Sequence, residues 1–381
     1  MQPDLIRYTA DLIRQTSRDR PADGVLRAAL KADTRLTPGE RRAVANAFFA
    51  YYRWRGWHDR KREIESRLDW SLELAARFQR NPFALPGDAL RAKAVPAWLA
   101  DAMDCPEPWL RALQREPRLW VRARPGQARA LAATLREAKV AKGWLVRDAV
   151  EYFGHRDLFT TEAFQQGKFE LQDIASQAVG EWCGPQPGET WWDACAGEGG
   201  KTLHLADLLA GRGQVFASDR ADWRLARLKQ RAARAGIQNY QSALWDGGAR
   251  RPFAQTFDGV LVDAPCSGVG TWQRNPHARW TVTPEDVREL AAAQGRLLAH
   301  TAPAVKPGGR LVYAVCTMTR AETTAVVEQF NAARPDFEPL PLRPLSDEAA
   351  KLGVPAKPTI TVWPQELGGN GMFVAAWRRK R

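Results

Sequence analysis

The stretch TWWDACAGEGGKT, residues 190–202, gives the strongest indication of the fold class. An apolar run ends at Trp192, a turn of small residues follows from Asp193 to Gly200, and leucines at helical spacing come after Lys201. A strand, a glycine-rich turn and a helix in this order typically begin an open α/β sheet. Glycines let a ligand approach the backbone closely, and the helix N-terminus offers unpaired N–H groups. The stretch therefore predicts a cofactor site.

The sequence after residue 202 continues the α/β alternation. GQVFASD (213–219) and DGVLVDAP (258–265) have the apolar, β-branched character of buried parallel strands. Helices are predicted at 221–236, 284–302 and 321–333, and strands at 310–316, 359–363 and 371–377, with a turn at 306–309. This order predicts a doubly wound sheet over residues 171–381.

The first 170 residues have a different pattern. Residues 1–80 have helical spacing of apolar side chains, and the Pro- and Gly-rich stretch 81–98 is predicted to be a linker or domain edge. Short helices are expected at 96–118, a helix at 127–138, and strands at 120–124, 142–153 and 168–171. We therefore expect an all-helical domain at 1–90, a helical linker with a small α+β module at 91–170, and a catalytic domain at 171–381.

The charge balance indicates a polyanionic partner. The formal net charge is +13 and the sequence pI is about 9.8, an excess that nucleic-acid binding would explain. The run YYRWRGWHDRKR (51–62) interleaves aromatic rings with arginines, and such a mixture can stack on RNA bases and meet phosphates. The same spacing also fits an amphipathic helix with its rings in the core, so both interpretations stay open.

The five cysteines lie far apart, at positions 105, 183, 195, 266 and 316. They form no C-x-x-C pair, so we expect no zinc or other metal site and no secreted disulfide framework. No signal peptide is recognisable, and no apolar run approaches the roughly 20 residues that cross a bilayer. We therefore expect a cytoplasmic protein without a membrane partner, in which Cys105, Cys183 and Cys195 are small core residues.

Four groups are predicted to meet at the carboxyl ends of the strands, where ligands bind in such sheets. They are the glycine-rich loop, Asp219, the segment from Asp263 to Cys266, and Cys316. Asp219 is placed to bind ribose hydroxyls. The loop matches neither G-x-G-x-x-G nor G-x-x-x-x-G-K-[ST], so we favour S-adenosylmethionine, which has no phosphate, over a dinucleotide.

Three motifs together resemble the Sun-family (RsmB-type) RNA cytosine-5 methyltransferases: DACAGEGGKT (193–202), DAPCSG (263–268) and KPGGRLVYAVCT (306–317). QDIASQ (172–177) and the stretch 361–379 resemble the segments that open and close their catalytic domain. The N-terminal helices and VPAWL (95–99) resemble the members with a NusB-like RNA-binding domain. Two departures stand out: Gly197-Glu198 replaces the usual Ala-Pro, and Val315-Cys316-Thr317 replaces the usual T-C-S at the second cysteine.

The resemblance implies a Rossmann-like methyltransferase fold and methyl transfer from S-adenosyl-L-methionine to carbon 5 of a cytosine in RNA, most often ribosomal RNA, with transfer RNA as another possible substrate. It implies that Cys316 is the nucleophile and that Cys266 assists breakdown of the adduct; spacing alone leaves the two assignments open. Asp263, on the same turn, is the candidate to bind nitrogen 3 of the ring. We expect a monomer.

The covalent route has a physical reason. Carbon 5 of cytosine is a poor nucleophile, and addition of a thiolate to carbon 6 converts the ring into an enamine that can attack a methyl sulfonium. The predicted cofactor contacts are Ala194, Cys195, Ala196, Gly197, Glu198, Gly199, Gly200, Lys201, Asp219, Asp246 and Asp263.

Some of these contacts also have plain structural interpretations. Lys201 could be a surface residue at a helix start, Asp246 could cap a turn, and Glu198 could face water rather than the methionine amino group. An alternative function is a non-catalytic, basic RNA-binding factor for ribosome assembly on a methyltransferase fold. An amino-methylating enzyme is disfavoured, because DAPC does not match the [DNS]-P-P-[YFW] segment typical of that class.

Overall fold

The computed structural model describes residues 1–143, 146–344 and 355–381. These residues form two compact units. The helical unit comprises residues 1–117 and 268–286, and the sheet unit comprises residues 118–267 and 287–381. Within the described residues, no helix is long and apolar enough to cross a membrane.

The helical unit is built from amphipathic helices with a shared apolar core. Its elements are α1 (Pro3–Arg14), α2 (Ala22–Ala32), α3 (Pro38–Arg53), η1 (Arg55–Trp57), α4 (Ile64–Arg80), η2 (Pro82–Ala84), α5 (Gly87–Lys93), α6 (Leu99–Ala102), α7 (Glu107–Ala112), η4 (Val269–Thr271) and η5 (Ala278–Trp280). A capping box starts α3: the Thr37 hydroxyl accepts from the Glu40 N–H, and the Glu40 carboxylate accepts from the Thr37 N–H. Phe48 and Tyr52, one helical turn apart on α3, lie in the core.

The segment 268–286 is held in the helical unit by a buried arginine. Arg279 is fully buried and donates to the carbonyl oxygens of four residues, Arg53, Ala94, Leu113 and Trp272, at 2.9–3.3 Å. Burial, together with the nearby Arg53 charge, lowers the pKa of Arg279 to about 9. The sequence analysis assigns residues 268–286 to the catalytic domain, whereas the Arg279 contacts place these residues with residues 1–117.

Two expectations for the helical unit need correction. The stretch 81–98 is not a linker: it contains α5, and Leu90 and Ala94 are fully buried. In the run 51–62, Tyr51, Tyr52 and Trp54 lie in the core and are not available to stack on bases. The amphipathic interpretation is right for these rings, because burying them stabilises the unit more than exposure would.

The sheet unit begins with a small antiparallel sheet, which confirms the predicted α+β module. Its strand order is β2-β3-β1-β4. The elements are β1 (Leu119–Ala123), α8 (Ala128–Leu135), β2 (Ala138–Val140), β3 (Ala149–Tyr152), η3 (Leu158–Thr160), α9 (Glu162–Gln165) and β4 (Phe169–Leu171). Val121, Leu131, Val150 and Phe169 form its apolar core. The predicted domain ranges differ from the units observed, since residues 91–117 pack in the helical unit and this module packs in the sheet unit.

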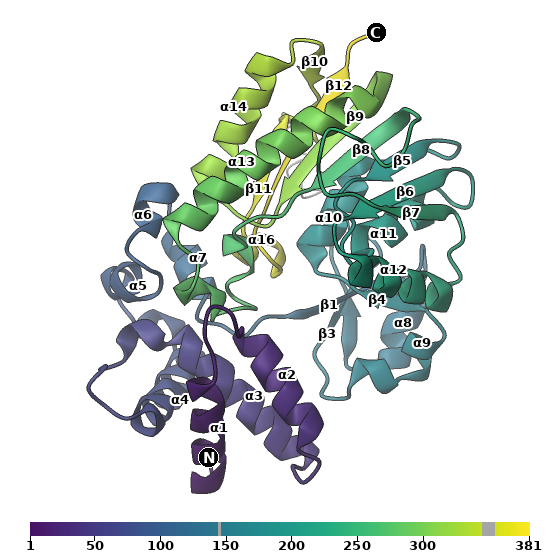
Figure 1. Ribbon diagram of the computed structural model, residues 1–381. Coiled ribbons are helices and arrows are strands. Elements are labelled where there is room, and N and C mark those ends of the chain that lie inside the picture. The colour runs from purple at the N-terminus through teal and green to yellow at the C-terminus, as the bar shows by residue number, and fades with distance from the viewer. Residues whose placement is uncertain (144–145, 345–354) are drawn as a thin grey trace. The chain divides into compact units, whose positions relative to one another are not determined.

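The main sheet has eight strands, in the order β10-β12-β9-β8-β5-β6-β7, with β11 paired to β12 (Figure 1). Its strands are β5 (Thr190–Asp193), β6 (Gln214–Asp219), β7 (Tyr240–Leu244), β8 (Phe257–Asp263), β9 (Val305–Val315), β10 (Phe337–Pro339), β11 (Thr359–Val362) and β12 (Met372–Arg379). Strands β5 to β9 run parallel, and β12 is antiparallel to β9. The strand order reverses between β5 and β8, which is where a doubly wound sheet binds its ligand.

Helices cover both faces of this sheet (Figure 1). They are α10 (Ile174–Cys183), α11 (Gly200–Leu208), α12 (Asp222–Ala235), α13 (Pro284–Thr301), α14 (Thr324–Ala333) and α16 (Pro364–Leu367), with the short turns η6 (Ala302–Ala304) and η7 (Arg320–Glu322). Trp191 packs with side chains of α10 and α11, and Trp192 packs with side chains of α13 and α14. Consecutive strand residues point to opposite faces, so this pair supplies a large apolar side chain to each layer.

Most of the predicted strands and helices are confirmed, with differences in the small sheet, at β9 and at the edges of the main sheet. Of the strand predicted at 142–153, only β3 is a strand and residues 144–145 lie outside the described residues, while β2 was not predicted. The predicted turn at 306–309 lies inside β9 as an irregularity of that strand. Val305 pairs with Phe257 of β8 and Arg310 pairs with Gly259, so the pairing register shifts between these two pairs. The sequence interpretation missed the edge strands β7 and β10. Edge strands give a weak sequence signal because they lack the continuous apolar run of central strands.

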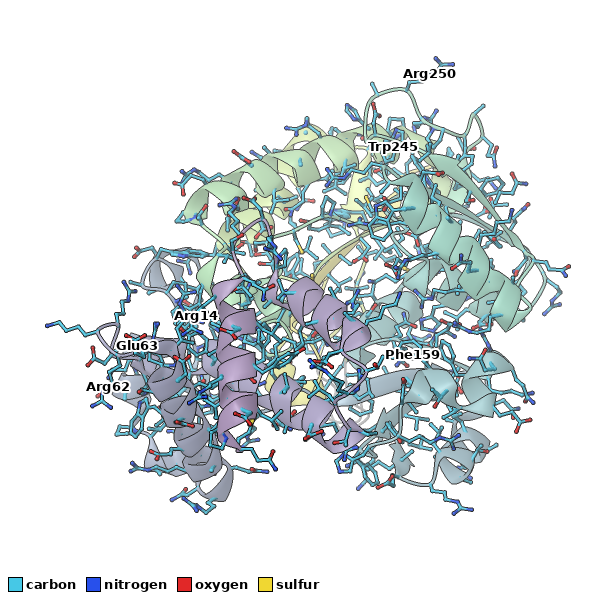
Figure 2. The ribbon with its side chains drawn as sticks, turned by 60° about the horizontal axis from the view of Figure 1, so that its bottom comes forward. Arg14, Arg62, Glu63, Phe159, Trp245 and Arg250 are labelled. Atoms are coloured by element: carbon cyan, nitrogen blue, oxygen red, sulfur yellow. The ribbon has the colours of Figure 1, made fainter. Side chains whose placement is uncertain are left out.

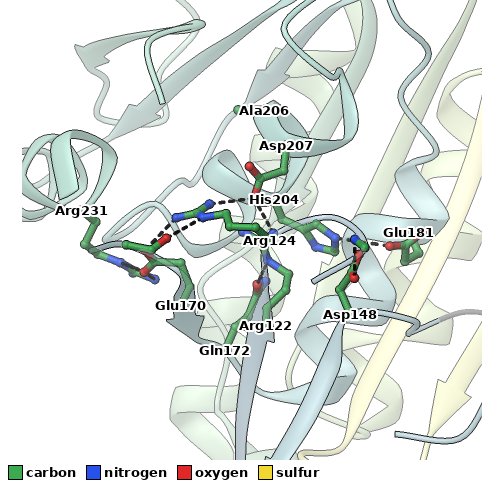
Figure 3. Close-up of polar contacts among 12 residues, drawn as sticks. Arg122, Arg124, Asp148, Glu170, Gln172, Glu181, His204, Ala206, Asp207 and Arg231 are labelled. Atoms are coloured by element: carbon green, nitrogen blue, oxygen red, sulfur yellow. Dashed lines mark hydrogen bonds and ion pairs between the residues drawn. The ribbon is translucent and has the colours of Figure 1, made fainter. Parts of the chain in front are cut away.

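A buried group of charges joins the small sheet to the helices of the main sheet (Figure 3). Glu170 of β4, 1% exposed, accepts from Arg231 and Arg234 of α12 at 3.0 and 2.5 Å. Asp207 of α11 accepts from Arg122 and Arg124, which flank the end of β1, at 2.5 and 2.8 Å. These paired charges fix the module on the face that carries α11 and α12.

Candidate active site

The glycine-rich loop runs from the end of β5 to the start of α11. Gly197 and Gly199 have positive φ values of 54° and 86°, which other residues rarely adopt. A Cβ atom at Gly199 would lie 2.5 Å from Leu228 Cγ, so glycine is also required for packing against α12. Arg231 donates to the carbonyl oxygen of Glu198 at 2.9 Å and holds the outer side of the loop.

A cavity of about 530 Å³ opens beside this loop, within the size range of small-ligand sites. It is lined by Ala194, Cys195, Ala196, Gly197, Glu198, Asp219, Arg220, Arg224, Trp245, Asp246, Gly247, Asp263, Ala264, Pro265, Ala293, Arg296 and Leu297. Eight of the eleven predicted contact residues are among them; Gly199, Gly200 and Lys201 are not. Gly199 caps α11, Gly200 and Lys201 are its first two residues, and the Lys201 side chain is buried.

Asp219 stands at the carboxyl end of β6, as predicted. Its Oδ2 accepts from the Gly197 N–H at 3.0 Å, and its Oδ1 accepts from the Ala221 N–H at 2.9 Å. These two bonds fix the carboxylate at the cavity wall and tie the glycine-rich loop to β6. Asp246 also lines the cavity while accepting from the Gly248 N–H at 2.8 Å, so it caps a turn at the cavity wall, and its contact with the cofactor stays a prediction.

Lys201 is buried and forms an ion pair with Asp263, with Nζ 2.6 Å from Oδ2. Burial alone would lower the pKa of Lys201, but the charge and hydrogen bond of Asp263, with smaller contributions from Asp193 and Cys316, raise it. The alternative of a surface lysine is therefore wrong. This pair joins the start of α11 to the end of β8, between the cofactor loop and the first of the two cysteine segments.

Asp193 was not predicted as a site residue. It is fully buried at the end of β5, its Oδ2 accepts from the Thr202 hydroxyl at 2.7 Å, and its Oδ1 has no hydrogen-bond partner. Burial raises its pKa to about 7. Its position as the last residue before the glycine-rich loop was the sequence signal that could have identified it.

Cys266 and Cys316 face each other, with their sulfur atoms 3.2 Å apart. The strand register explains this, because β8 and β9 are parallel neighbours with Asp263 opposite Ala314. The two loops therefore leave the same edge of the sheet at the same level. Both thiols are partly exposed. The sequence predicted that the two would meet, and the structure brings them together.

The other three cysteines lie apart from this pair. Cys183 is fully buried in the core of the sheet unit, where burial raises its pKa. Cys195 is partly exposed at the cavity wall and Cys105 is partly exposed in the helical unit. The expectation of a small core residue is right for Cys183 and only partly right for the other two.

The sequence interpretation missed several cavity residues for lack of a signal. Trp245, 5% exposed, and Leu297 of α13 supply apolar surface to the wall, and Arg224 and Arg296 supply positive charge. Of these four residues, only Trp245 is adjacent in the sequence to a residue already singled out, Asp246. The others come from helices whose periodicity does not show which end meets the ligand.

With the geometry established, comparison with known proteins identifies the family. The sequence model described as 16S rRNA methyltransferase RsmB/F matches residues 181–378, slightly more than half of the chain. The chain belongs to the RsmB/F methyltransferase family. S-adenosylmethionine is the cofactor of this family, and the cavity beside Asp219 has the residues and size to hold it.

Curated relatives agree with this assignment. The "Probable ribosomal RNA small subunit methyltransferase B" of Synechocystis sp. is 37% identical over 56% of this chain and 48% of its own length. The protein of the same name from Bacillus subtilis is 36% identical over 64% of this chain and 54% of its own length. The "Ribosomal RNA small subunit methyltransferase B" of Escherichia coli is 30% identical over 75% of this chain and 66% of its own length. The chain thus spans about half to two thirds of the length of these relatives.

Solved structures show the same fold. The crystal structure of PH0851 covers 100% of this chain at a TM-score of 0.80 and 25% identity, and this chain covers 99% of it. A methyltransferase homologue from Pyrococcus horikoshii covers 72% of this chain at a TM-score of 0.61 and 24% identity, with 90% of its own chain covered. The second likeness concerns the fold alone.

Proposed function

We propose that this chain transfers a methyl group from S-adenosylmethionine to carbon 5 of a cytosine in RNA through a covalent cysteine adduct. The observation that carries the proposal is the pair of thiols 3.2 Å apart, together with the ion pair between buried Lys201 and partly exposed Asp263 at the edge of the cavity. Two thiols that meet at one ring can divide a difficult substitution into an addition and an elimination.

The residues would act in sequence. The thiolate of Cys316 forms a bond to carbon 6 while nitrogen 3 takes a proton from water, which it returns at the elimination. The Asp263 carboxylate, held by Lys201, would accept a hydrogen bond from this N–H and so favour the addition. S-adenosylmethionine, when bound, supplies an electrophilic methyl group to carbon 5. The thiolate of Cys266 then takes the proton from carbon 5, the bond between carbon 6 and sulfur breaks, and the Cys316 thiolate leaves.

The cofactor would lie in the cavity beside the glycine-rich loop. Asp219 would accept hydrogen bonds from the ribose hydroxyls, and Trp245 and Leu297 would contact the adenine. Oδ1 of Asp193 is buried without a hydrogen-bond partner, so it would accept a hydrogen bond from a ligand donor such as the methionine amino group. The substrate would be ribosomal RNA, because the curated relatives carry that name and the chain has a net charge of +13.

The test separates the two thiols. We expect Cys316→Ala to form no adduct with RNA, because the attacking sulfur is gone. Cys266→Ala should form the bond but resolve it slowly, and should accumulate a protein–RNA complex that survives denaturing gel electrophoresis and requires both cytosine and S-adenosylmethionine.

Two outcomes would contradict this assignment. A stable adduct in Cys316→Ala with none in Cys266→Ala would exchange the two roles. No adduct in either variant, together with no methyl transfer by the unmodified chain to any RNA, would favour a non-catalytic RNA-binding role. Cys183→Ala serves as the matched control, because that thiol is buried away from the pair.

A further inference from the structure

One buried carboxylate lies behind both cysteine loops. Glu322, at the end of η7, is 0% exposed and contacts neither the cavity wall nor the two sulfur atoms among the contacts described. Its neighbours are instead the residues that follow the two cysteines, Ser267 and Thr317. We propose that Glu322 is a positioning residue that fixes the distance between the Cys266 and Cys316 thiols.

The hydrogen bonds to Glu322 divide between its two oxygens. Oε1 accepts from the backbone N–H of Ser267 at 2.8 Å and from Nε2 of Gln294 at 3.0 Å. Oε2 accepts from the hydroxyls of Ser267, Thr317 and Thr319 at 2.5, 3.2 and 2.8 Å. The carboxylate therefore accepts five bonds, and three of them come from residues directly after a cysteine.

The two cysteine loops also contact each other through these residues. The hydroxyls of Ser267 and Thr317 lie 3.0 Å apart, so together with Glu322 Oε2 they form a closed triangle. Because Ser267 is held by both its N–H and its hydroxyl, the peptide group between Cys266 and Ser267 has a fixed orientation. Charge-assisted bonds of this kind are stronger than neutral ones, so the carboxylate is better suited than an amide to hold the triangle.

Glu322 is itself held in place by buried neighbours. Its carbonyl oxygen accepts from the Tyr313 hydroxyl at 2.7 Å, and the same hydroxyl lies 2.9 Å from Gln294 Oε1. Gln294 in turn donates to the carbonyl oxygen of Pro265, directly before Cys266, at 2.9 Å. The network thus contacts the chain on both sides of Cys266 and directly after Cys316.

This arrangement has a consequence for the proposed reaction, on which the inference rests. One thiol can add to carbon 6 and the other can remove the proton from carbon 5 of the same ring only if the distance between the two sulfur atoms is maintained while the ring is bound. Small displacements of reacting groups reduce rates strongly, even when their cause lies away from the chemistry. Glu322 would set that spacing without touching the substrate.

The experiment compares Glu322→Gln with Glu170→Gln in the full chain. Glutamine keeps the size of the side chain but replaces one acceptor by a donor and removes the charge. Glu170 is the matched control, because it is a 1% exposed carboxylate of the same unit that accepts from arginines and contacts neither cysteine loop among the contacts described (Figure 3).

The first measurement is the rate of Cys266–Cys316 disulfide formation with diamide, followed by peptide mass spectrometry. The two thiols lose two protons and two electrons, one S–S bond forms, and diamide is reduced to its hydrazine. We expect Glu322→Gln to react about tenfold more slowly than the unmodified chain, and Glu170→Gln to react at the unmodified rate. This readout does not depend on RNA or on methyl transfer, so it tests the positioning even if the proposed function fails.

The second measurement is methyl transfer. We expect Glu322→Gln to lower kcat by about 10- to 100-fold, with the KM for S-adenosylmethionine unchanged. The factor should be the same across neutral pH, because the groups that transfer protons are still present. A changed pH profile would instead mean that Glu322 itself exchanges a proton in the reaction, and would overturn the positioning role.

A second variant guards against misfolding of Glu322→Gln. The double change Ser267→Ala with Thr317→Val removes two of the hydroxyls but leaves the carboxylate and Thr319 in place. We expect it to slow disulfide formation in the same direction. Disulfide formation at the unmodified rate in folded Glu322→Gln, or in the double variant, would overturn the inference.

Discussion

Asp219 is the residue of the cavity wall whose predicted role in cofactor binding a substitution tests most directly. Its carboxylate is 6% exposed and already accepts two backbone N–H groups, so it is fixed before any ligand arrives. A carboxylate fixed in this way binds hydroxyl groups without a further loss of side-chain entropy.

We expect Asp219→Asn to weaken S-adenosylmethionine binding by about 1–3 kcal/mol, because the buried ribose hydroxyls lose a charged acceptor. Isothermal titration calorimetry of the full chain measures this. Asp222→Asn, at an exposed aspartate in the first turn of α12, is the control and should bind as the unmodified chain does. Equal affinity in Asp219→Asn would remove Asp219 from the cofactor site.

A titration at His58 gives a second prediction at the residue scale. Burial, aided by the Arg67 and Arg55 charges, lowers the pKa of this imidazole to about 4, and its Nε2 lies 2.7 Å from the Ser71 hydroxyl. In the unfolded chain the pKa is about 6.5, so the unfolded state binds the proton first as the pH falls. Stability contributed by neutral His58 is therefore present above about pH 6.5 and is lost toward about pH 4.

His58→Gln removes this titration. We expect its thermal midpoint to fall less than that of the unmodified chain between about pH 7 and about pH 5. Differential scanning calorimetry of both proteins at each pH measures the difference. His155→Gln changes an exposed histidine and should follow the unmodified chain. An equal pH dependence in all three proteins would show that His58 is not responsible.

At the scale of elements, the junction between β5 and α11 depends on close packing as well as on backbone conformation. Gly199 begins α11 with a positive φ and has Leu228 of α12 directly above the place of a Cβ atom. The loop is therefore fixed from two sides, by the α12 packing and by the Arg231 bond to Glu198.

We expect Gly199→Ala to destabilise the sheet unit by about 2–4 kcal/mol and to weaken cofactor binding, because strain from the positive φ adds to a clash with Leu228. Gly211→Ala is the control: its φ is 72°, but nothing lies within 4 Å of the added atom. Strain alone should cost it about 1 kcal/mol. Urea unfolding measures both, and equal losses would mean that the contact with Leu228 contributes nothing.

At the scale of the whole molecule, charge is the property that bears on RNA. The net charge is +13, and Arg60, Lys61 and Arg62 are exposed in the loop before α4. Arg62 lies on the outer side of the helical unit (Figure 2). Because the rings of Tyr51, Tyr52 and Trp54 are buried, this loop would meet phosphates and not bases.

We expect Arg60→Ala with Arg62→Ala to weaken RNA binding and to reduce the salt dependence of the affinity, because fewer counterions are released. The plot of the logarithm of the association constant against the logarithm of the salt concentration should become less steep, with its negative slope reduced in magnitude by about 1–2. Arg212→Ala with Lys229→Ala removes the same charge from exposed positions of the sheet unit and is the control. Equal effects of both pairs would mean that net charge, and not this loop, determines the affinity.

Four of the five parallel strands, β5, β6, β8 and β9, and the residues at their carboxyl ends could be predicted from the sequence alone. A glycine-rich turn between an apolar strand and a helix, an acid after the next strand and two later cysteines are local patterns, and each follows from backbone conformation or burial. Asp219, Asp263, Cys266 and Cys316 could be singled out for that reason.

The contacts between side chains far apart in the sequence could be found only in the three-dimensional structure. The pairing of Lys201 with Asp263, the orphaned oxygen of Asp193 and the five bonds to Glu322 depend on strand register and on helices from distant parts of the sequence. The same holds for the segment 268–286, which follows the first cysteine motif in the sequence but packs with the helical unit through Arg279. Local patterns record which residues are buried, whereas the partner of a buried charge is set by what the fold places beside it.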